Sequence, residues 1–81
     1  MTFPEFPGHF DGDPLVPGAA LLEWVAREAG LARFTRVRFV APVRPGEAVA
    51  LELARDGDRV RFTIRGEDGL RARGEGHASA T

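Results

Sequence analysis

The distribution of apolar and polar positions predicts one helix in the first half of the chain. Prolines and glycines recur through residues 1–16, a composition that excludes a regular helix and favours an extended, turning segment. Pro17 supplies a fixed φ suited to a first helical position, and the run Gly18–Ala29 that follows is largely apolar. We therefore expect a helix over this run that ends at Gly30.

The predicted helix is apolar around most of its circumference. We therefore expect other segments of the protein to pack against it on several sides. One solvent-exposed side should remain, formed by Glu23, Arg27 and Glu28. A carboxyl group on such a helix should be partly desolvated, which favours its protonated form. An i,i+4 ion pair with Arg27 would instead keep Glu23 ionised. The sequence leaves both states of Glu23 open.

Beyond residue 35 the apolar period changes to that of strands. Segments 36–41 and 48–53 each predict a strand with one face in the core. Their expected inward residues are Val37, Phe39 and Ala41, then Val49, Leu51 and Leu53. Asp56-Gly57 predicts a tight hairpin into a third strand, whose inward residues are Val60, Phe62 and Ile64.

Asp68-Gly69 starts a fourth predicted strand, and small residues occupy one face of it. Such a row indicates close approach of another backbone, for example that of the central helix. The row consists of Leu70, Ala72, Gly74, Gly76 and Ala78. The expected architecture is one helix followed by a four-stranded antiparallel meander, in a single domain over residues 1–81.

Composition limits the classes of function. The chain has no cysteine and a formal net charge of −1, which excludes thiolate chemistry and argues against the overall basicity typical of nucleic-acid binding. Its first residues lack the features of a secretory signal, and no segment approaches the ~20 apolar residues of a membrane span. We expect a cytoplasmic protein that binds neither nucleic acid nor membrane.

Residues suited to acid–base chemistry lie just before and within the predicted helix. The stretch Phe6–Gly18 contains His9 and is followed five residues later by Glu23. An imidazole titrates near neutrality and can act as a general base, and a desolvated carboxyl group can act as an acid. The N–H of Gly18, at the positive end of the helix, can stabilise a developing oxyanion.

The run Gly8-His9-Phe10-Asp11-Gly12-Asp13-Pro14 resembles the active-site signature of the beta-hydroxyacyl-acyl-carrier-protein dehydratases. In that signature Gly-His-Phe-x-Gly-x-Pro leads through Pro-Gly into a central helix that carries an acidic residue. The segment Val37–Glu47 is similar to the family's strand–turn segment, in which Pro-Val-x-Pro-Gly and an acidic residue precede the next strand. Together the two resemblances cover nearly the whole chain.

The resemblance implies an α+β hot-dog fold, in which a short antiparallel sheet of about four strands wraps one central helix. Relatives usually carry further strands before the histidine, so we expect an N-terminally abbreviated version. The implied reaction is dehydration of a 3-hydroxyacyl thioester on acyl carrier protein, in fatty-acid, polyketide or aryl-polyene-type biosynthesis, without cofactor or metal.

The resemblance also implies the site residues and the assembly. His9 would be the general base, Glu23 the general acid, and Gly18 the donor to the substrate carbonyl. The expected substrate pocket contains Phe10, Pro17 and Trp24. In similar proteins the histidine and the acid come from different subunits, so a homodimer or an assembly of dimers is implied, and the open edge of a four-stranded sheet favours the same conclusion.

Two local features refine this hypothesis. Leu22-Glu23-Trp24-Val25 is similar to the aryl-polyene and pigment-pathway branch, which tends to carry an acid–Trp pair. Arg27 stands where the family tends to have glutamine, which bears on the protonation state of Glu23.

Other residues have simpler interpretations. His77 is expected to be structural or exposed, and Asp11 and Asp13 suit a turn better than a metal site, because the later glutamate of a calcium loop is missing. Most outward-facing arginines should form a solvated surface, although one or two could steer an acidic acyl carrier protein. These are Arg36, Arg38, Arg59, Arg61, Arg65, Arg71 and Arg73.

Two other functions remain open. The chain could be a hot-dog thioesterase or an enoyl-CoA hydratase. It could also be a non-catalytic subunit that binds acyl chains or another hot-dog subunit.

Overall fold

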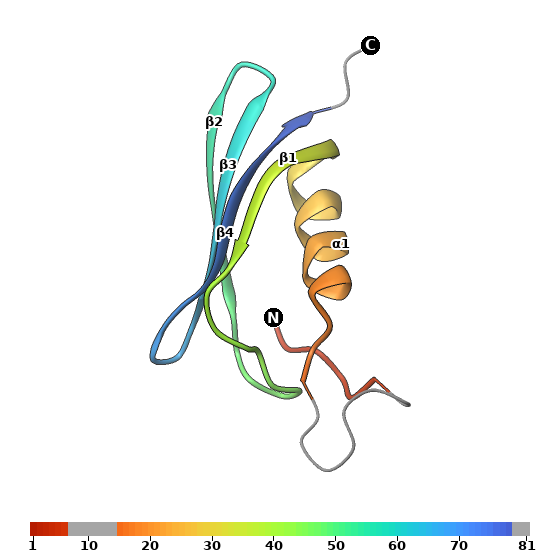
Figure 1. The fold of residues 1–81 in the computed structure, drawn as a ribbon, viewed down its shortest axis with the longest axis vertical. Coiled ribbons are helices and arrows are strands. Elements are labelled where there is room, and N and C mark those ends of the chain that lie inside the picture. The colour runs from red at the N-terminus through yellow and green to blue at the C-terminus, as the bar shows by residue number, and fades with distance from the viewer. Residues whose placement is uncertain (7–14, 79–81) are drawn as a thin grey trace.

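The chain folds into one helix that lies against one face of an antiparallel sheet (Figure 1). The computed structural model describes residues 1–6 and 15–78. The helix, α1, spans Gly18–Ala29. The strands are β1 (Leu31–Phe39), β2 (Ala50–Asp56), β3 (Arg59–Gly66) and β4 (Gly69–Ala78), in the spatial order β1-β4-β3-β2.

The ends of α1 lie within one residue of those that the sequence predicts. Pro17 is the N-cap, with extended backbone at φ −60° and ψ 143°, so it precedes the first helical residue. Gly30 ends the helix at φ 70°, a left-handed conformation that costs glycine little, and its N–H donates to the Ala26 carbonyl oxygen. Proline has no side-chain acceptor, so Pro17 cannot cap the N–H groups of the first turn.

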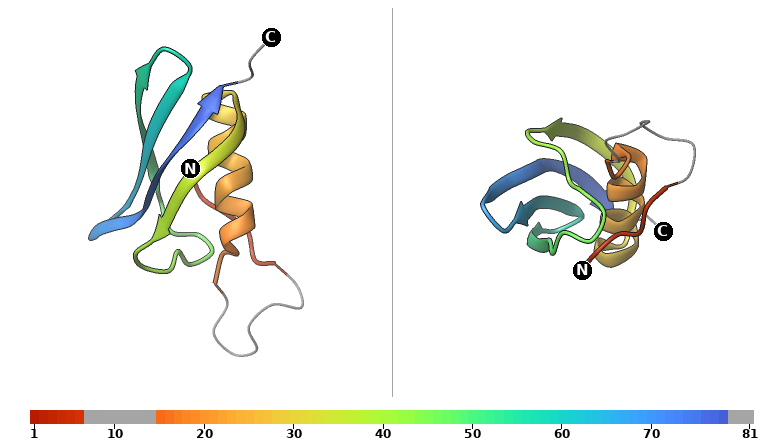
Figure 2. Two further views of the ribbon diagram at one scale, coloured as in Figure 1. Left: turned by 45° about the horizontal axis from the view of Figure 1, so that its top comes forward. Right: turned by 90° about the horizontal axis from the view of Figure 1, so that it is seen from below.

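One face of α1 is buried within the chain. Leu21, Val25 and Ala29 are buried at intervals of four residues and face the sheet. Glu23, Arg27 and Glu28 are exposed on the other side. Figure 2 shows the sheet curving around α1 from one side. The several-sided burial expected from the apolar composition is therefore not reached within the single chain.

The predicted hairpin at Asp56-Gly57 is present, and a second two-residue turn leads into β4. Asp56 pairs with Arg59 across a two-residue turn, in which Gly57 has φ 62°. Gly66 pairs with Gly69 across the second turn. The side chains of β3 alternate as expected, since Val60, Phe62 and Ile64 are buried.

The predicted meander is wrong at β1, which pairs with β4 rather than with β2. Residues 40–49 connect β1 to β2 and contain Pro42 and Pro45. The connection is too long for a tight hairpin, and proline cannot donate ladder hydrogen bonds. Residues 40–49, the crossover segment, therefore carry the chain to the far edge of the sheet, where β2 pairs with β3. β1 pairs with the free edge of β4.

β1 also departs from the predicted alternation of side chains. Its pairing with β4 shifts register between Leu31 and Arg33, and again between Phe34 and Arg36. Such irregularities change which side chains face the core. The partly buried positions are therefore three residues apart, at Leu31, Phe34 and Val37. Phe39, expected in the core, is 51% exposed.

The small residues of β4 accommodate the backbone of β1. A Cβ added to Gly74 would overlap the carbonyl oxygen of Arg36, and one added to Gly76 would overlap that of Arg33. The sequence correctly indicated a close backbone approach here. The backbone that approaches both glycines is that of the irregular strand β1 and not that of the central helix.

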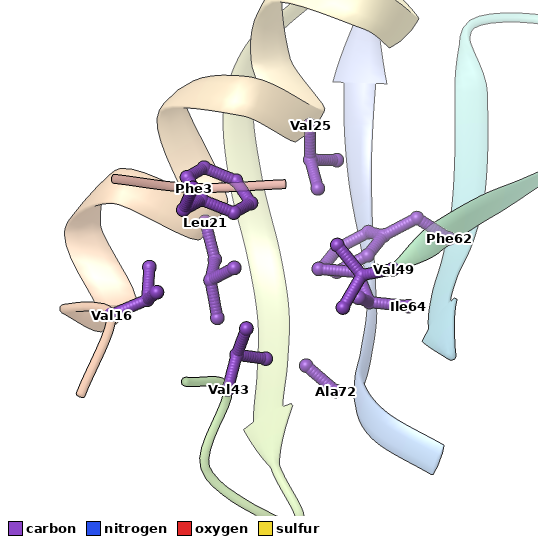
Figure 3. Packing of buried hydrophobic residues seen from close by; sticks show 9 residues of the cluster. All are labelled: Phe3, Val16, Leu21, Val25, Val43, Val49, Phe62, Ile64 and Ala72. Atoms are coloured by element: carbon purple, nitrogen blue, oxygen red, sulfur yellow. The ribbon is translucent and has the colours of Figure 1, made fainter. Parts of the chain in front are cut away.

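The core lies between α1 and the sheet and includes residues from three irregular segments (Figure 3). Its buried cluster consists of Phe3, Val16, Leu21, Val25, Val43, Val49, Phe62, Ile64 and Ala72. Burial of one such large side chain contributes about 1.5–3 kcal/mol. Residues 1–6 are held to the crossover by backbone hydrogen bonds, because Val49 N–H donates to the Met1 carbonyl and Gly46 N–H to that of Phe3.

Candidate active site

The N-terminus of α1 meets the end of β1 and the crossover segment. The Val16 N–H donates to the Val43 carbonyl oxygen at 2.8 Å, which ties the residues before the helix to the crossover. Gly18 then packs against the Phe39 ring, since a Cβ built on Gly18 would lie 2.8 Å from Phe39 Cζ. Any larger residue at position 18 would have to displace that ring.

An apolar groove opens at this end of the helix, with a volume of about 410 Å³. Its lining comes from the residues before α1, from the first turn of α1 and from the end of β1 with the crossover. The lining residues are Val16, Gly18, Leu21, Phe39, Val40, Ala41, Pro42 and Val43. The positive end of the helix dipole and an apolar surface thus lie side by side, an arrangement suited to a polar head and an apolar tail.

Glu23 lies on the opposite side of α1 from the buried residues. It is two residues beyond Leu21, roughly 200° around the helix. The Glu23 side chain is 71% exposed, and its Oε1 accepts a hydrogen bond from Arg27 Nη2 at 2.6 Å. The ion pair considered from the sequence is therefore present. The single chain does not supply the desolvation expected for this carboxyl group.

The structure brings together only part of the predicted site. Gly18 lines the groove, and Pro17 is the residue just before Gly18 in the chain. Trp24 is partly buried and packs edge-on against Phe3, with ring centroids 5.5 Å apart, so it belongs to a different part of the helix surface. His9 and Phe10 lie outside the described residues, and the prediction that they join the site remains a prediction.

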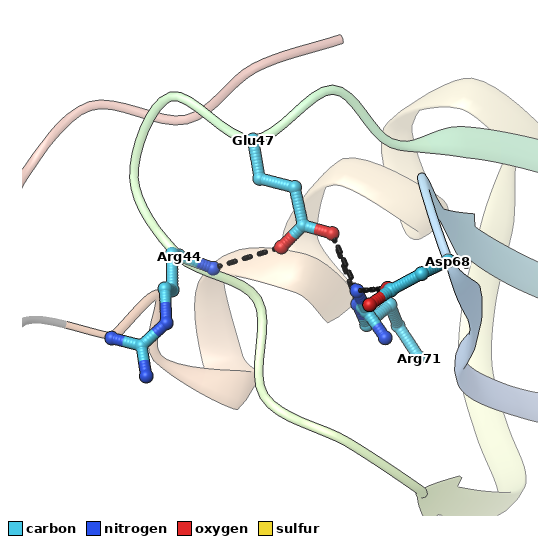
Figure 4. A network of polar contacts seen from close by, with 4 residues as sticks. All are labelled: Arg44, Glu47, Asp68 and Arg71. Carbon is cyan, nitrogen blue, oxygen red and sulfur yellow. Dashed lines mark hydrogen bonds and ion pairs between the residues drawn. The ribbon is translucent and has the colours of Figure 1, made fainter.

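A partly buried ion-pair network holds the crossover in place (Figure 4). Glu47 Oε2 accepts hydrogen bonds from Arg71 Nη2 at 2.7 Å and Nε at 3.1 Å, and its Oε1 accepts from the Arg44 N–H at 3.3 Å. Arg71 also pairs with Asp68. The hydrogen bond from Arg71 holds the pKa of the Glu47 carboxyl below its ordinary value.

This network positions one wall of the groove. Both Val40 and Ala41 donate their N–H groups to the Arg71 carbonyl oxygen, at 2.8 and 3.1 Å. The backbone of Arg71 thus supports two lining residues while its side chain anchors Glu47. The alternation of β4 predicts a solvated Arg71, but its side chain is 13% exposed and is paired with Glu47. The sequence feature that could have indicated this pair is the acidic residue after Pro45-Gly46.

The described part of the chain has neither a membrane-spanning helix nor a metal-binding cluster. Its helix is too short and too polar to cross a membrane. Within residues 1–6 and 15–78, no three histidine, cysteine or acidic side chains form a cluster that could hold a metal ion. His77 is partly buried and pairs in register with Arg33 and Arg59, toward the end of the sheet remote from Gly18.

Comparisons with known proteins agree with this architecture. In sequence, 3-hydroxyacyl-acyl-carrier-protein dehydratases named FabZ are similar to the chain. The protein of Syntrophobacter fumaroxidans is 36% identical over 66 residues, which is 62% of this chain and 45% of the relative. That of Verminephrobacter eiseniae is 34% identical over 90 aligned positions, which is 89% of this chain and 59% of the relative. The chain thus spans about half the length of these curated relatives.

Solved structures show the same fold. The dehydratase heterocomplex ApeI:P from Xenorhabdus doucetiae contains a chain that matches 95% of this one, with 80% of its own length, at a TM-score of 0.81 and 23% identity. An uncharacterized protein from Erwinia carotovora matches 89% of this chain, with 69% of its own, at a TM-score of 0.73 and 27% identity. One helix against an antiparallel sheet defines both this chain and its neighbours as hot-dog proteins.

The model of the family described as ApeI-like, ApeI dehydratase, matches residues 2–75. The chain therefore belongs to the ApeI-like dehydratase family.

Proposed function

We propose that this protein removes water from a 3-hydroxyacyl thioester to form the trans-2-enoyl thioester. The observation that carries the proposal is the match of the dehydratase family model to residues 2–75. The geometry around Gly18 supports it, because an apolar groove adjoins the positive end of α1. A thioester carbonyl at that helix end and an acyl chain along the groove would each meet a suitable environment.

Each step of the reaction has a candidate residue. His9, a neutral imidazole, would accept the proton from the carbon next to the thioester carbonyl. The Gly18 N–H would stabilise the charge that develops on the carbonyl oxygen. Protonated Glu23 would donate its proton to the leaving hydroxyl group, so that the C–O bond breaks, the C=C bond forms and water departs. Proton transfer from His9 to the Glu23 carboxylate or through solvent would restore the enzyme.

The exposure of Glu23 supports a site shared between two subunits. The Glu23 side chain is 71% exposed and paired with Arg27, so the single chain does not give it the water-excluded surroundings that suit a general acid. A second subunit over this face of α1 would exclude water and bring its own His9 toward Glu23. The partner would be a second copy of this chain, in a homodimer or an assembly of dimers. The structural neighbour from Xenorhabdus is a heterocomplex, so a different hot-dog subunit is the second candidate.

The acyl carrier would be an acyl carrier protein, as the names of the FabZ relatives state for those enzymes. The Glu23-Trp24 pair and the ApeI family model favour an aryl-polyene-type substrate over a saturated fatty chain. Such synthesis would place the protein in the cytoplasm. Phe10, Pro17 and Trp24 would shape the acyl pocket once the assembly is complete.

The proposal is tested by following enoyl absorbance with a 3-hydroxyacyl thioester. Glu23→Gln and His9→Ala should each lower kcat/KM at least about a hundredfold, since each removes one acid–base role. Glu28→Gln is the matched control, because Glu28 is an exposed carboxylate on the same helix. It should retain wild-type activity. Full activity of either site variant would remove that residue from the mechanism.

The same assay separates the alternative enzymes. A thioesterase would release free thiol from the thioester, and a coenzyme A-dependent hydratase would prefer the coenzyme A substrate to the carrier-protein substrate. A non-catalytic subunit would bind the acylated carrier without turnover, and His9→Ala would leave that binding unchanged.

A further inference from the structure

The outer face of the sheet, on the side away from α1, carries a cluster of four arginines. Pairing between strands places Arg36, Glu75 and Arg61 in one row across β1, β4 and β3, and Arg38, Arg73 and Thr63 in the next. The residues between these rows, such as Phe62, face the core. The arginine cluster (Arg36, Arg38, Arg61 and Arg73) therefore lies on the opposite face of the sheet from the helix and its groove.

These four guanidinium groups have no ion-pair partner among the described residues. Other arginines of the sheet do: Arg59 pairs with Asp56, Arg65 with Glu52, and Arg71 with Glu47 and Asp68. Glu75 is the one carboxylate that lines the same hollow, and its Oε1 lies 3.9 Å from Nε of Arg59. Four guanidinium groups and one carboxylate give this part of the surface a net charge of about +3.

This concentration of charge opposes folding. Arg38 lies directly opposite Arg73 in the ladder, and like charges in cross-strand positions are destabilising. The chain does not lack acidic residues, since it has 12 of them against 11 arginines. A merely solvated face could have alternated both signs. The unfavourable arrangement indicates that the cluster meets an anion supplied from outside.

The cluster surrounds a hollow of about 500 Å³. The four arginines line it together with Thr63 and Glu75, which lie in the same two rows. Three neighbouring strands contribute, so the hollow is about 10 Å wide, twice the spacing between strands. This width suits a compact anion that several guanidinium groups can contact at once.

The surroundings distinguish this anion from a macromolecule. A stable protein interface buries more than about 1,000 Å² and usually has apolar or aromatic anchors near its centre. The exposed large apolar residues of the described chain are Met1, Phe39, Val40 and Leu53. None of them lines the hollow. A nucleic acid would extend beyond the cluster onto a chain whose remaining surface is acidic, because the formal net charge is −1.

We propose that the arginine cluster binds a small, soluble compound through a multiply charged phosphoryl group. Guanidinium groups bind phosphoryl oxygens in pairs of parallel hydrogen bonds, a geometry that lysine cannot reproduce. Thr63 also lines the hollow and offers a hydroxyl group as a neutral donor. The proposal concerns a second site and is independent of the proposed dehydration.

Calorimetric titration of the full chain with inorganic pyrophosphate at low salt tests the proposal. The wild type should bind, and the double variant Arg38→Gln/Arg73→Gln should bind at least about tenfold more weakly, because two charged hydrogen-bond donors are lost. The control is Arg33→Gln/Arg55→Gln, which removes the same charge from exposed arginines outside the hollow. It should bind as the wild type does.

Several outcomes would overturn the proposal. Equal weakening in both double variants would indicate attraction by net charge alone. If pyrophosphate produced neither a heat of binding nor NMR chemical-shift changes, the cluster would not be a phosphoryl-binding site. Tighter binding of poly-glutamate, of a single-stranded oligonucleotide or of vesicles containing phosphatidic acid would identify a macromolecule or a membrane as the ligand. Thermal melting of each variant shows that the fold is intact.

Discussion

Two arginine–carboxylate pairs of this protein have the same chemistry and opposite surroundings. The Arg71–Glu47 pair joins β4 to the crossover, and its side chains are only 13% and 15% exposed. The Arg27–Glu23 pair lies along one helix face, with side chains 73% and 71% exposed. The first pair connects residues 24 positions apart, whereas the second connects residues four positions apart, in successive turns of α1.

Burial decides how firmly each pair is held. A partly buried pair with several hydrogen bonds resists separation, because either partner alone would be left poorly solvated. An exposed i,i+4 pair competes with water and contributes little to stability. Arg71–Glu47 is therefore part of the framework that holds the groove. Arg27–Glu23 is a weak local contact that a substrate or a second subunit can rearrange.

The largest effect on stability should come from Glu47→Ala. This variant removes the carboxylate that accepts two hydrogen bonds from Arg71 and one from the Arg44 N–H. We expect the free energy of unfolding to fall by about 2 kcal/mol. Urea denaturation followed by circular dichroism measures it. Glu52→Ala is the control, because Glu52 accepts from Arg65 Nε at 3.0 Å but is 58% exposed. An equal loss in the two variants would show that burial does not distinguish these pairs.

The pH dependence of stability sharpens the same comparison. Since the pKa of Glu47 is lowered in the folded state, its contribution is fully present above the ordinary value of 4.5 and is lost as the pH falls through the folded pKa. Below pH 4.5 the wild type should lose stability more steeply than Glu47→Gln, and the difference between them should narrow. Urea midpoints over a pH series would record this. Parallel curves would show that Glu47 has the same pKa in both states.

The smallest effect should come from Arg27→Gln. Loss of one exposed helical ion pair should change the free energy of unfolding by only about 0.3–0.5 kcal/mol. The same urea experiment measures it, with Glu28→Gln as a neighbour of similar exposure. A loss as large as that of Glu47→Ala would mean that α1 is covered on this face in solution, for example by a second subunit.

The candidate site was predictable in part. The catalytic hypothesis rested on a motif around His9 and on its spacing to Glu23, both of which are properties of the sequence alone. The position of Gly18 at the helix N-terminus also followed from Pro17 and the apolar run after it. The close packing of Phe39 against Gly18 did not, because the register shifts in β1 change the faces of its side chains. The role of Arg71 was missed because its partner lies in a distant loop.

By itself the sequence determined the features that depend on neighbouring residues. The bounds of α1, the hairpin at Gly57, the start of the last strand at Gly69 and the inward face of β3 follow from backbone preferences and periodicity over a few positions. Tertiary structure alone decided that β1 lies beside β4, that Gly74 meets the backbone of β1 and that Glu47 finds Arg71. Each of these joins segments far apart along the chain, where the choice of partner depends on how the whole sheet and helix pack together.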